Sequence, residues 1–104
     1  MSEKLTEGQL LERANKARGI LENQMYKESF EMVHKAIIAR IESCPLSDSA
    51  ALGDLHKCLR LLRDVRANLD LALQQGKVVS FRIEQERAAE EKRKKFHLTP
   101  NFYR

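Results

Sequence analysis

The fold of this protein is decided by residues 52–76, which read LGDLHKCLRLLRDVRANLDLALQQG. Leucines recur in this stretch at steps of three and four residues, the spacing that places side chains on one face of an α-helix. These leucines are Leu52, Leu55, Leu59, Leu62, Leu69 and Leu73. Four neighbours widen the apolar sector to about half of the helix circumference, namely Cys58, Leu61, Val65 and Ala72. Because a sector this wide exceeds the seam between two helices, we expect two neighbouring helices, from the same chain or from another copy.

Arg66, Leu71 and Gly76 carry more specific expectations for this helix. Arg66 falls inside the apolar sector. Either its methylene groups line the edge of the core with the guanidinium in water, or the guanidinium sets the register by pairing with a carboxylate. Leu71 lies outside the sector, so we expect it to be exposed. Gly76 is placed to end the helix as a left-handed cap residue.

A capping box opens the first helix that we predict in the chain. Thr6 and Gln9 stand three residues apart in the motif TEGQ, where Thr6 accepts from the backbone and Gln9 reaches back to it. The helix is predicted from residue 7 to about residue 21. Asn23 and Gln24 either break the helix at that point or lie inside a longer one.

A second helix is predicted at about residues 25–43, because apolar side chains form two stripes along it. The first stripe consists of Tyr26, Phe30, Val33, Ile37 and Ile41. The second stripe consists of Met25, Met32 and Ala36. Since methionine adapts its shape readily, Met25 and Met32 belong either to an adaptable core or to a surface that recognises a partner.

The two main helices are joined by a short turn. Cys44 ends the second helix, because a residue before proline is pushed out of the α region. Ser47, Asp48 and Ser49 offer N-caps for the helix that follows. So short a connection predicts an antiparallel helical hairpin.

The chain beyond Gly76 is predicted to form an arm. Residues 78–83 are expected to be a linker that turns into another helix, with Ser80 as its cap. Residues 84–95, EQERAAEEKRKK, are strong helix formers with almost nothing to bury, so this helix is expected to project from the rest. The last nine residues carry four large apolar side chains, which we expect to dock within the chain or on another molecule. They are Phe96, Leu98, Phe102 and Tyr103. We divide the chain into a helical domain, residues 1–79, and this arm, residues 80–104.

The composition is typical of long helices and lacks the signatures of an enzyme. A third of the 104 residues are charged, and tryptophan is absent. The two cysteines, Cys44 and Cys58, stand outside any CxxC motif, so we expect small buried thiols and no metal ion. No phosphate-binding loop or nucleophile motif is present, which predicts a non-catalytic protein without cofactor or small-molecule substrate. We find no signal peptide and no apolar run near the roughly 18 residues of a membrane span, so we expect a cytoplasmic protein.

Basic residues gather at two places, and the net charge is +4. They are Lys57, Arg60 and Arg63 on the long helix, and Lys92, Arg93, Lys94 and Lys95 near the end of the arm. Each cluster is either a solvated helix face or a contact for an anionic partner. Acidic residues are interspersed nearly everywhere, and no motif of a nucleic-acid-binding fold is present. Nucleic-acid binding through phosphate contacts is therefore an alternative function rather than the first.

Residues 17–77 resemble small α-helical proteins of tailed bacteriophages and prophages whose function is uncharacterised. The residues that carry this resemblance are Ala17, Leu21, Asn23, Phe30, Pro45, Asp48, Leu62, Val65, Leu69, Gly76 and Lys77. The resemblance implies a protein made in an infected bacterium, present in the host cytoplasm or in the virion. It carries no functional residues over to this chain, and the arm lies outside it.

Together these features predict an all-α protein with an antiparallel helical hairpin, a shorter N-terminal helix and a projecting, partly helical C-terminal arm. The expected function is that of a non-catalytic structural or interaction protein, such as a phage virion or assembly component. It would form homo-oligomers or bind a protein partner through its apolar helix faces and its arm. A small helical inhibitor or regulator of a host protein is a further alternative.

Overall fold

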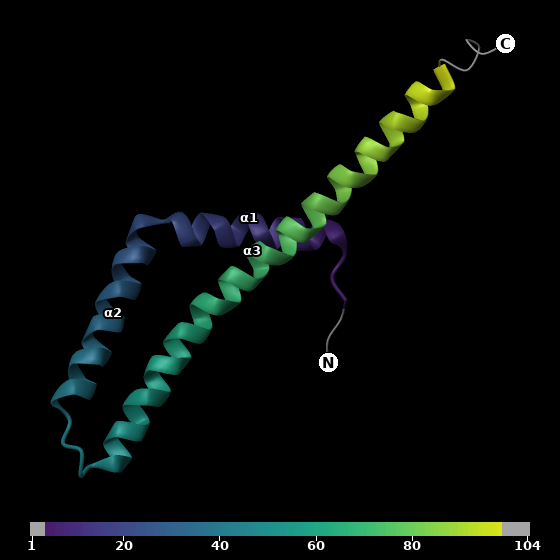
Figure 1. Cartoon of the computed structure of the whole chain (residues 1–104). Helices are drawn as coiled ribbons and strands as arrows, with labels where there is room; N and C mark the ends of the chain where they lie inside the picture. The colour runs from purple at the N-terminus through teal and green to yellow at the C-terminus, as the bar shows by residue number, and fades with distance from the viewer. Residues whose placement is uncertain (1–3, 99–104) are drawn as a thin grey trace.

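The computed structural model of the chain describes residues 4–98, and these residues form three α-helices. The helices are α1 (Glu7–Glu22), α2 (Gln24–Ser43) and α3 (Ser49–Leu98). The described residues contain no strand, so the predicted all-α class is confirmed. Helices α2 and α3 form the predicted antiparallel hairpin, and α1 crosses α3 beyond it (Figure 1).

Each helix begins where a local side chain satisfies its first backbone N–H groups. The capping box of α1 is confirmed: the N–H of Gln9 donates to Thr6 Oγ1 (3.1 Å), and the N–H of Thr6 donates to Gln9 Oε1 (2.8 Å). Asn23 is extended and separates α1 from α2, and its Oδ1 accepts from the N–H of Tyr26 (2.9 Å). Asp48 does the same for α3 by accepting from the N–H of Ala51 (3.1 Å). The three predicted helix starts are therefore set by short-range hydrogen bonds.

Helix α3 does not end at Gly76, which corrects the predicted cap. It continues through residues 78–83, predicted as a linker, and ends at Leu98 after 50 residues. Gly76 has no positive φ, and Ser80 lies inside the helix rather than at its start. At 1.5 Å per residue the helix is about 75 Å long. The division of the chain at residue 79 stays a prediction, although α3 runs through that position without a break.

Gly76 serves a different purpose from the predicted one, because it lies where α1 and α3 come closest. It is buried, and a Cβ added to it would overlap the Cβ of Ala14 in α1. Small side chains surround this crossing, since Ala14, Ala17 and Ala72 are all buried. A glycine in the middle of a helix costs stability, but here it lets the two helix backbones approach each other.

The core is small and lies mainly between α1 and α3. These two helices pack against each other more extensively than α2 and α3 do. The buried apolar residues in the described part of the chain are Ala14, Ala17, Leu59, Ala72 and Val79. Helix α2 contains no buried residue. The hairpin is thus present, but the tightest seam joins α1 to α3 rather than α2 to α3.

The molecule is long rather than globular. Its radius of gyration is 23.5 Å and its extents are 86 × 32 × 22 Å, whereas a compact domain of this length has a radius of gyration of about 13 Å. The end of α3 projects beyond its crossing with α1 (Figure 1), which confirms a projecting arm that is helical up to Leu98. The two predicted neighbours of α3 are α1 and α2, and they contact it at successive levels along its length.

Candidate protein-interaction surfaces

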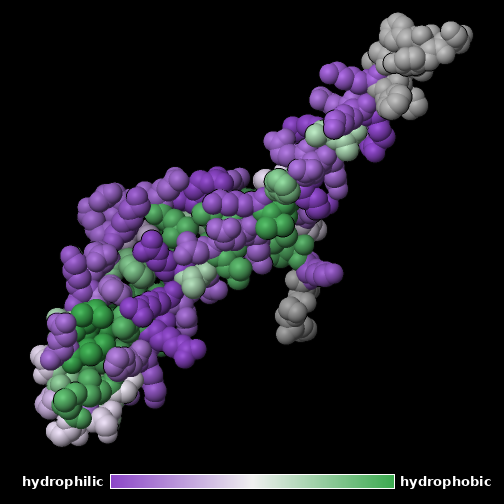
Figure 2. Space-filling view, in the orientation of Figure 1, coloured by the Kyte–Doolittle hydropathy of each residue, from purple (hydrophilic) through white to green (hydrophobic). Residues whose placement is uncertain are grey.

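Large apolar side chains lie exposed on all three helices. In residues 4–95, whose side chains the structure describes, eleven of them are exposed: Leu5, Ile20, Met25, Met32, Val33, Leu46, Leu61, Val65, Leu71, Val78 and Phe81. Figure 2 shows hydrophobic surface at the end of the molecule where α2 turns into α3, and again where α1 crosses α3. The projecting end of α3 is mostly hydrophilic in the same view. Single exposed apolar residues are ordinary, so what matters is how these residues group.

The first group is the methionine stripe of α2. Met25 is 68 % exposed and Met32 is 72 % exposed, so neither belongs to a core within the described part of the chain. The adaptable-core interpretation of this stripe is therefore wrong here. Its role as a surface for a partner stays a prediction.

The second group lines a groove where the three helices meet. The groove has a volume of about 640 Å³, and its walls come from α1, α2 and α3. Ile20, Tyr26, Val65, Leu69 and Ala72 supply its apolar surface. The hydroxyl of Tyr26 is buried, and no hydrogen-bond partner for it is found among residues 4–98. The groove is therefore mainly an apolar contact surface.

The third group lies on the outer face of α3, away from α1. Leu71, Val78 and Phe81 are 54 %, 67 % and 66 % exposed. The exposure of Leu71 confirms its predicted place outside the apolar sector. Val78 and Phe81 were missed as surface residues because the helix was predicted to end at Gly76. The signal that would have found them is the step of seven residues from Leu71 to Val78, which keeps both on one helix face.

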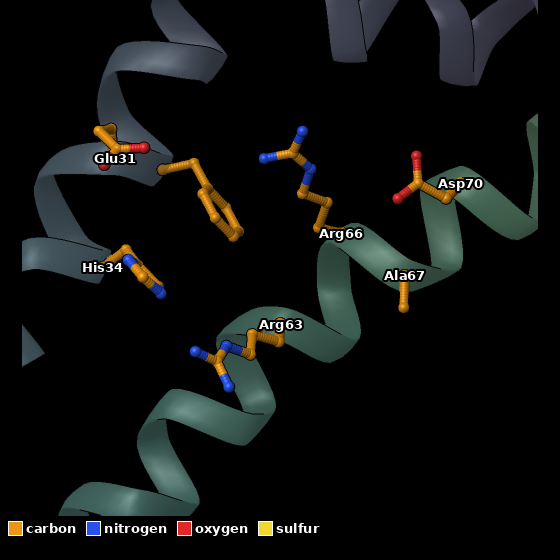
Figure 3. A pocket seen from close by; sticks show the side chains of 7 residues that line it. Glu31, His34, Arg63, Arg66, Ala67 and Asp70 are labelled. Atoms are coloured by element: carbon orange, nitrogen blue, oxygen red, sulfur yellow. The ribbon is translucent and has the colours of Figure 1, made fainter. Parts of the chain in front are cut away.

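Between α2 and α3, charged side chains and one aromatic ring face each other across a second groove. Phe30, Glu31 and His34 come from α2, and they lie opposite Arg63, Arg66 and Asp70 from α3 (Figure 3). The guanidinium of Arg66 sits over the ring of Phe30, with its Cζ 5.3 Å from the ring centre. Arg66 is thus held by a cation–π contact, which neither prediction for it included. This side of the hairpin seam is polar and open.

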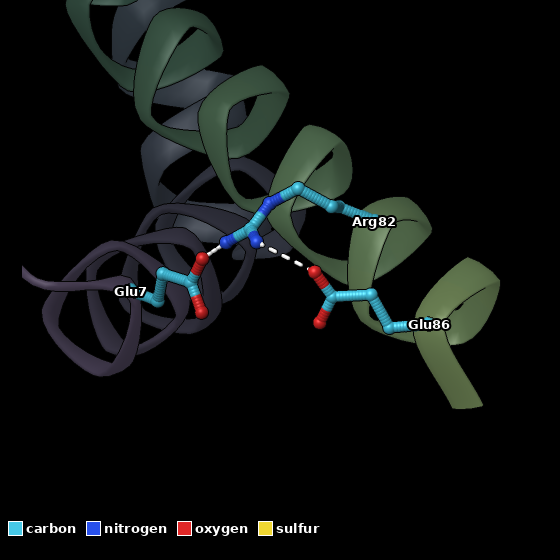
Figure 4. Close-up of polar contacts among 3 residues, drawn as sticks. All are labelled: Glu7, Arg82 and Glu86. Atoms are coloured by element: carbon cyan, nitrogen blue, oxygen red, sulfur yellow. Dashed lines mark hydrogen bonds and ion pairs between the residues drawn. The ribbon is translucent and has the colours of Figure 1, made fainter. Parts of the chain in front are cut away.

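Arg82 links the base of the arm to the start of α1. Its guanidinium pairs with Glu7 of α1 and with Glu86 one turn further along α3 (Figure 4). The side chains of Arg82 and Glu7 are each 48 % exposed and that of Glu86 is 67 % exposed, so the pairs contribute at most about 1 kcal/mol each.

The two predicted basic clusters lie on one helix but are not brought together. Lys57, Arg60 and Arg63 are exposed on the first half of α3, and Lys92, Arg93, Lys94 and Lys95 are exposed near its end. The 29 residues from Arg63 to Lys92 correspond to about 44 Å along the helix. Arg93 pairs with Glu90 at 2.5 Å. A continuous basic surface is therefore not formed by the described residues.

The two cysteines are more exposed than the sequence predicted. Cys58 is exposed and Cys44 is half-buried, so the predicted burial of both thiols is wrong. The reason is that Cys58 shares its helix face with the exposed Leu61, and it lies before Val65, where the groove lined by α1 begins.

Of the predicted docking residues, Phe102 and Tyr103 lie outside the described residues, and so do the side chains of Phe96 and Leu98. Their role stays a prediction.

No group of three or more His, Cys, Asp and Glu side chains within residues 4–95 is arranged to hold a metal ion. None of the three described helices has an apolar stretch long enough to cross a membrane.

No family model, no curated protein and no solved structure matches the chain.

Proposed function

We propose that this protein is a non-catalytic structural protein that assembles with other protein molecules through its exposed apolar helix faces. The observation that carries the proposal is the imbalance between core and surface. Five apolar residues are buried in residues 4–95, and four of those five are alanine or valine, while eleven apolar side chains of the size of valine or larger are exposed. In most monomeric proteins of this size the large side chains fill the core.

The long helices α2 and α3 have little packing to hold them in place. Most of the stability of a helix in a protein comes from packing of an apolar face rather than from helix propensity. Helix α2 has no buried residue, and the end of the 50-residue α3 projects beyond its crossing with α1. Contacts with another protein molecule would bury the exposed apolar side chains and supply the missing packing at about 25 cal/mol per Å².

The resemblance of residues 17–77 to small helical phage proteins supports a setting in a phage particle or its assembly. In that setting the protein would be found in the cytoplasm of the bacterial host or in the virion. The partner would be another copy of the chain or a second protein of the particle. The arm would reach that partner with its terminal apolar residues.

The test is the native mass of the complex that the protein forms in the cell that makes it. We expect a discrete homo-oligomer, or a complex of fixed stoichiometry with one other protein. Native mass spectrometry of the gently purified complex measures this directly. A bare monomer of 12.0 kDa would contradict the proposal.

A deletion variant separates the arm from the rest. Removing residues 96–104 is expected to lower the number of subunits in the complex, because the terminal apolar side chains are lost, while the helix content of the remaining chain is unchanged by circular dichroism. A complex that keeps its number of subunits would show that the arm plays no part in docking.

A further inference from the structure

The outer face of α3 carries a regular stripe that no described part of the chain covers. Its residues alternate steps of three and four: Leu71, Gln74, Val78, Phe81, Gln85 and Ala88. All six are exposed. This is the spacing by which one helix packs along another in a coiled coil. We call these residues the outer stripe.

The outer stripe is distinct from the face of α3 that packs on α1. That inner face contains Ala72, Gly76 and Val79, which are buried. At 100° per residue the two sets lie roughly half a turn apart on the helix. Helix α1 therefore cannot reach the outer stripe, and the arrangement of α3 between α1 and open solvent leaves room for another helix (Figure 1).

We propose that the outer stripe is the contact with a second copy of this chain, with the two α3 helices antiparallel. The inference rests on the proposed assembly function and names its partner and geometry. A second copy presents the same stripe, and a two-fold axis brings the two stripes together. Each residue of the outer stripe then lies opposite a residue of the second copy, and each such pair forms one layer of the contact. The pairs are Val78 with Phe81, Gln74 with Gln85, and Leu71 with Ala88.

The sizes of the paired side chains favour the antiparallel direction. In it the large Leu71 meets the small Ala88, twice by symmetry. The glutamine amides face each other in either direction, so they do not decide it. A parallel pair would set Phe81 against Phe81 and Ala88 against Ala88, which leaves layers of unequal width. Cores lose stability both from overfilled layers and from empty ones.

The charges beside the stripe favour the same direction. Lys77 and Glu84 flank it on one side, and in the antiparallel pair Lys77 faces Glu84 of the second copy, twice by symmetry. In a parallel pair Lys77 would face Arg82 of the second copy instead, also twice. The antiparallel register does bring Asp70 near Glu91 of the second copy. This like-charged pair lies toward the ends of the contact, so it limits the affinity without changing the direction.

Charge reversal tests the direction. Lys77→Glu and Glu84→Lys should each weaken dimerisation about tenfold, because two attractions become repulsions of similar size. The double variant should restore it. Sedimentation equilibrium of the intact chain at low ionic strength, with a reductant to keep Cys58 reduced, measures the dissociation constants. If Lys77→Glu strengthens the dimer, the helices are parallel, and if the double variant fails to recover, the proposed pairing is wrong.

An apolar substitution tests the surface. Phe81→Ala should abolish the dimer, whereas the control Met32→Ala, which truncates an equally exposed side chain on α2, should leave it intact. Circular dichroism confirms that both variants keep their helix content. The opposite pattern would move the contact to α2 and overturn the proposal. A purified chain that stays monomeric at every concentration also overturns it, while the broader assembly function fails only if the cell contains no complex either.

Discussion

Gly76 and Gly53 both lie inside α3, yet an added methyl group would meet different surroundings at the two positions. At Gly76 it would overlap Ala14, whereas at Gly53 nothing lies within 4 Å. Gly76→Ala should therefore lower the free energy of unfolding by about 1–2 kcal/mol, because forced overpacking outweighs the gain in helix propensity. Gly53→Ala should raise it by up to about 1 kcal/mol. Urea unfolding followed at 222 nm measures both, and equal stabilisation by the two variants would show that α1 and α3 are not in close contact.

The hydroxyl and the ring of Tyr26 are expected to contribute differently to stability. Its hydroxyl is buried with no hydrogen-bond partner among the described residues, while its ring lies against Phe30 with the ring centres 6.0 Å apart. Tyr26→Phe should leave the stability unchanged or raise it by about 1 kcal/mol, since a desolvated hydroxyl without a partner is unfavourable.

The control for this prediction is Tyr26→Ala, which removes the ring as well and should destabilise the protein. Thermal unfolding of the three proteins gives the comparison. A clear loss of stability in Tyr26→Phe would mean that the hydroxyl has a partner beyond residues 4–98 or in another molecule.

At the scale of the helices, Asn23 alone separates α1 from α2. It ends one helix with its N–H, which donates to the carbonyl of Ile20 (3.1 Å), and caps the next with its side chain. Asn23→Ala should lower the free energy of unfolding by about 1 kcal/mol, because the N–H of Tyr26 loses its acceptor. Asn23→Asp keeps an acceptor and should retain the stability. Unfolding curves that do not distinguish the alanine and aspartate variants would show that the cap contributes nothing.

The helix starts could be predicted from the sequence because each depends on a few adjacent residues. Thr6 with Gln9, and Asp48 after Pro45, carry their signal within one helical turn. The end of α3 could not be predicted in this way. A glycine caps a helix in one setting and permits a close crossing in another, and only the distant residue Ala14 decides between the two for Gly76.

The candidate surfaces were likewise predictable where they depend on adjacent residues and not where they depend on distant ones. The apolar stripes of α2 and α3 were visible in the sequence, and so was the need of α3 for two neighbours. Which stripe stays exposed depends on where α1 stops, because the contacts of α1 with α3 extend from Val65 to Arg82 and leave Leu61 uncovered. The outer stripe also crosses the point where the helix was predicted to end, so its full length appears only once α3 is known to be continuous.

At the scale of the whole molecule, the shape explains why a lone chain is poorly supported. Most of the buried apolar residues lie at the crossing of α1 and α3, and both the hairpin end and the projecting end of α3 extend away from it (Figure 1). An antiparallel partner would place residues 84–95 of its projecting end alongside residues 64–75 of α3. Each projecting end would then lie beside a segment that α1 and α2 already contact, which makes the pairing mutually stabilising.

The distance between the two Cys58 residues distinguishes the antiparallel dimer from a parallel one. Cys58 is exposed and lies about 21 residues from the centre of the outer stripe, so the two Cys58 residues of an antiparallel dimer should be about 64 Å apart along α3. In a parallel dimer they would lie within about 25 Å of each other, given the usual spacing of packed helices. Spin labels on Cys58 in a Cys44→Ser background, measured by pulsed electron resonance, distinguish the two. A label at Ser80→Cys with both native cysteines replaced should give a short distance in either case, because it lies near the dimer axis. A short Cys58 distance together with a short Ser80→Cys distance would contradict the antiparallel pairing, and absence of both distances would contradict the dimer itself.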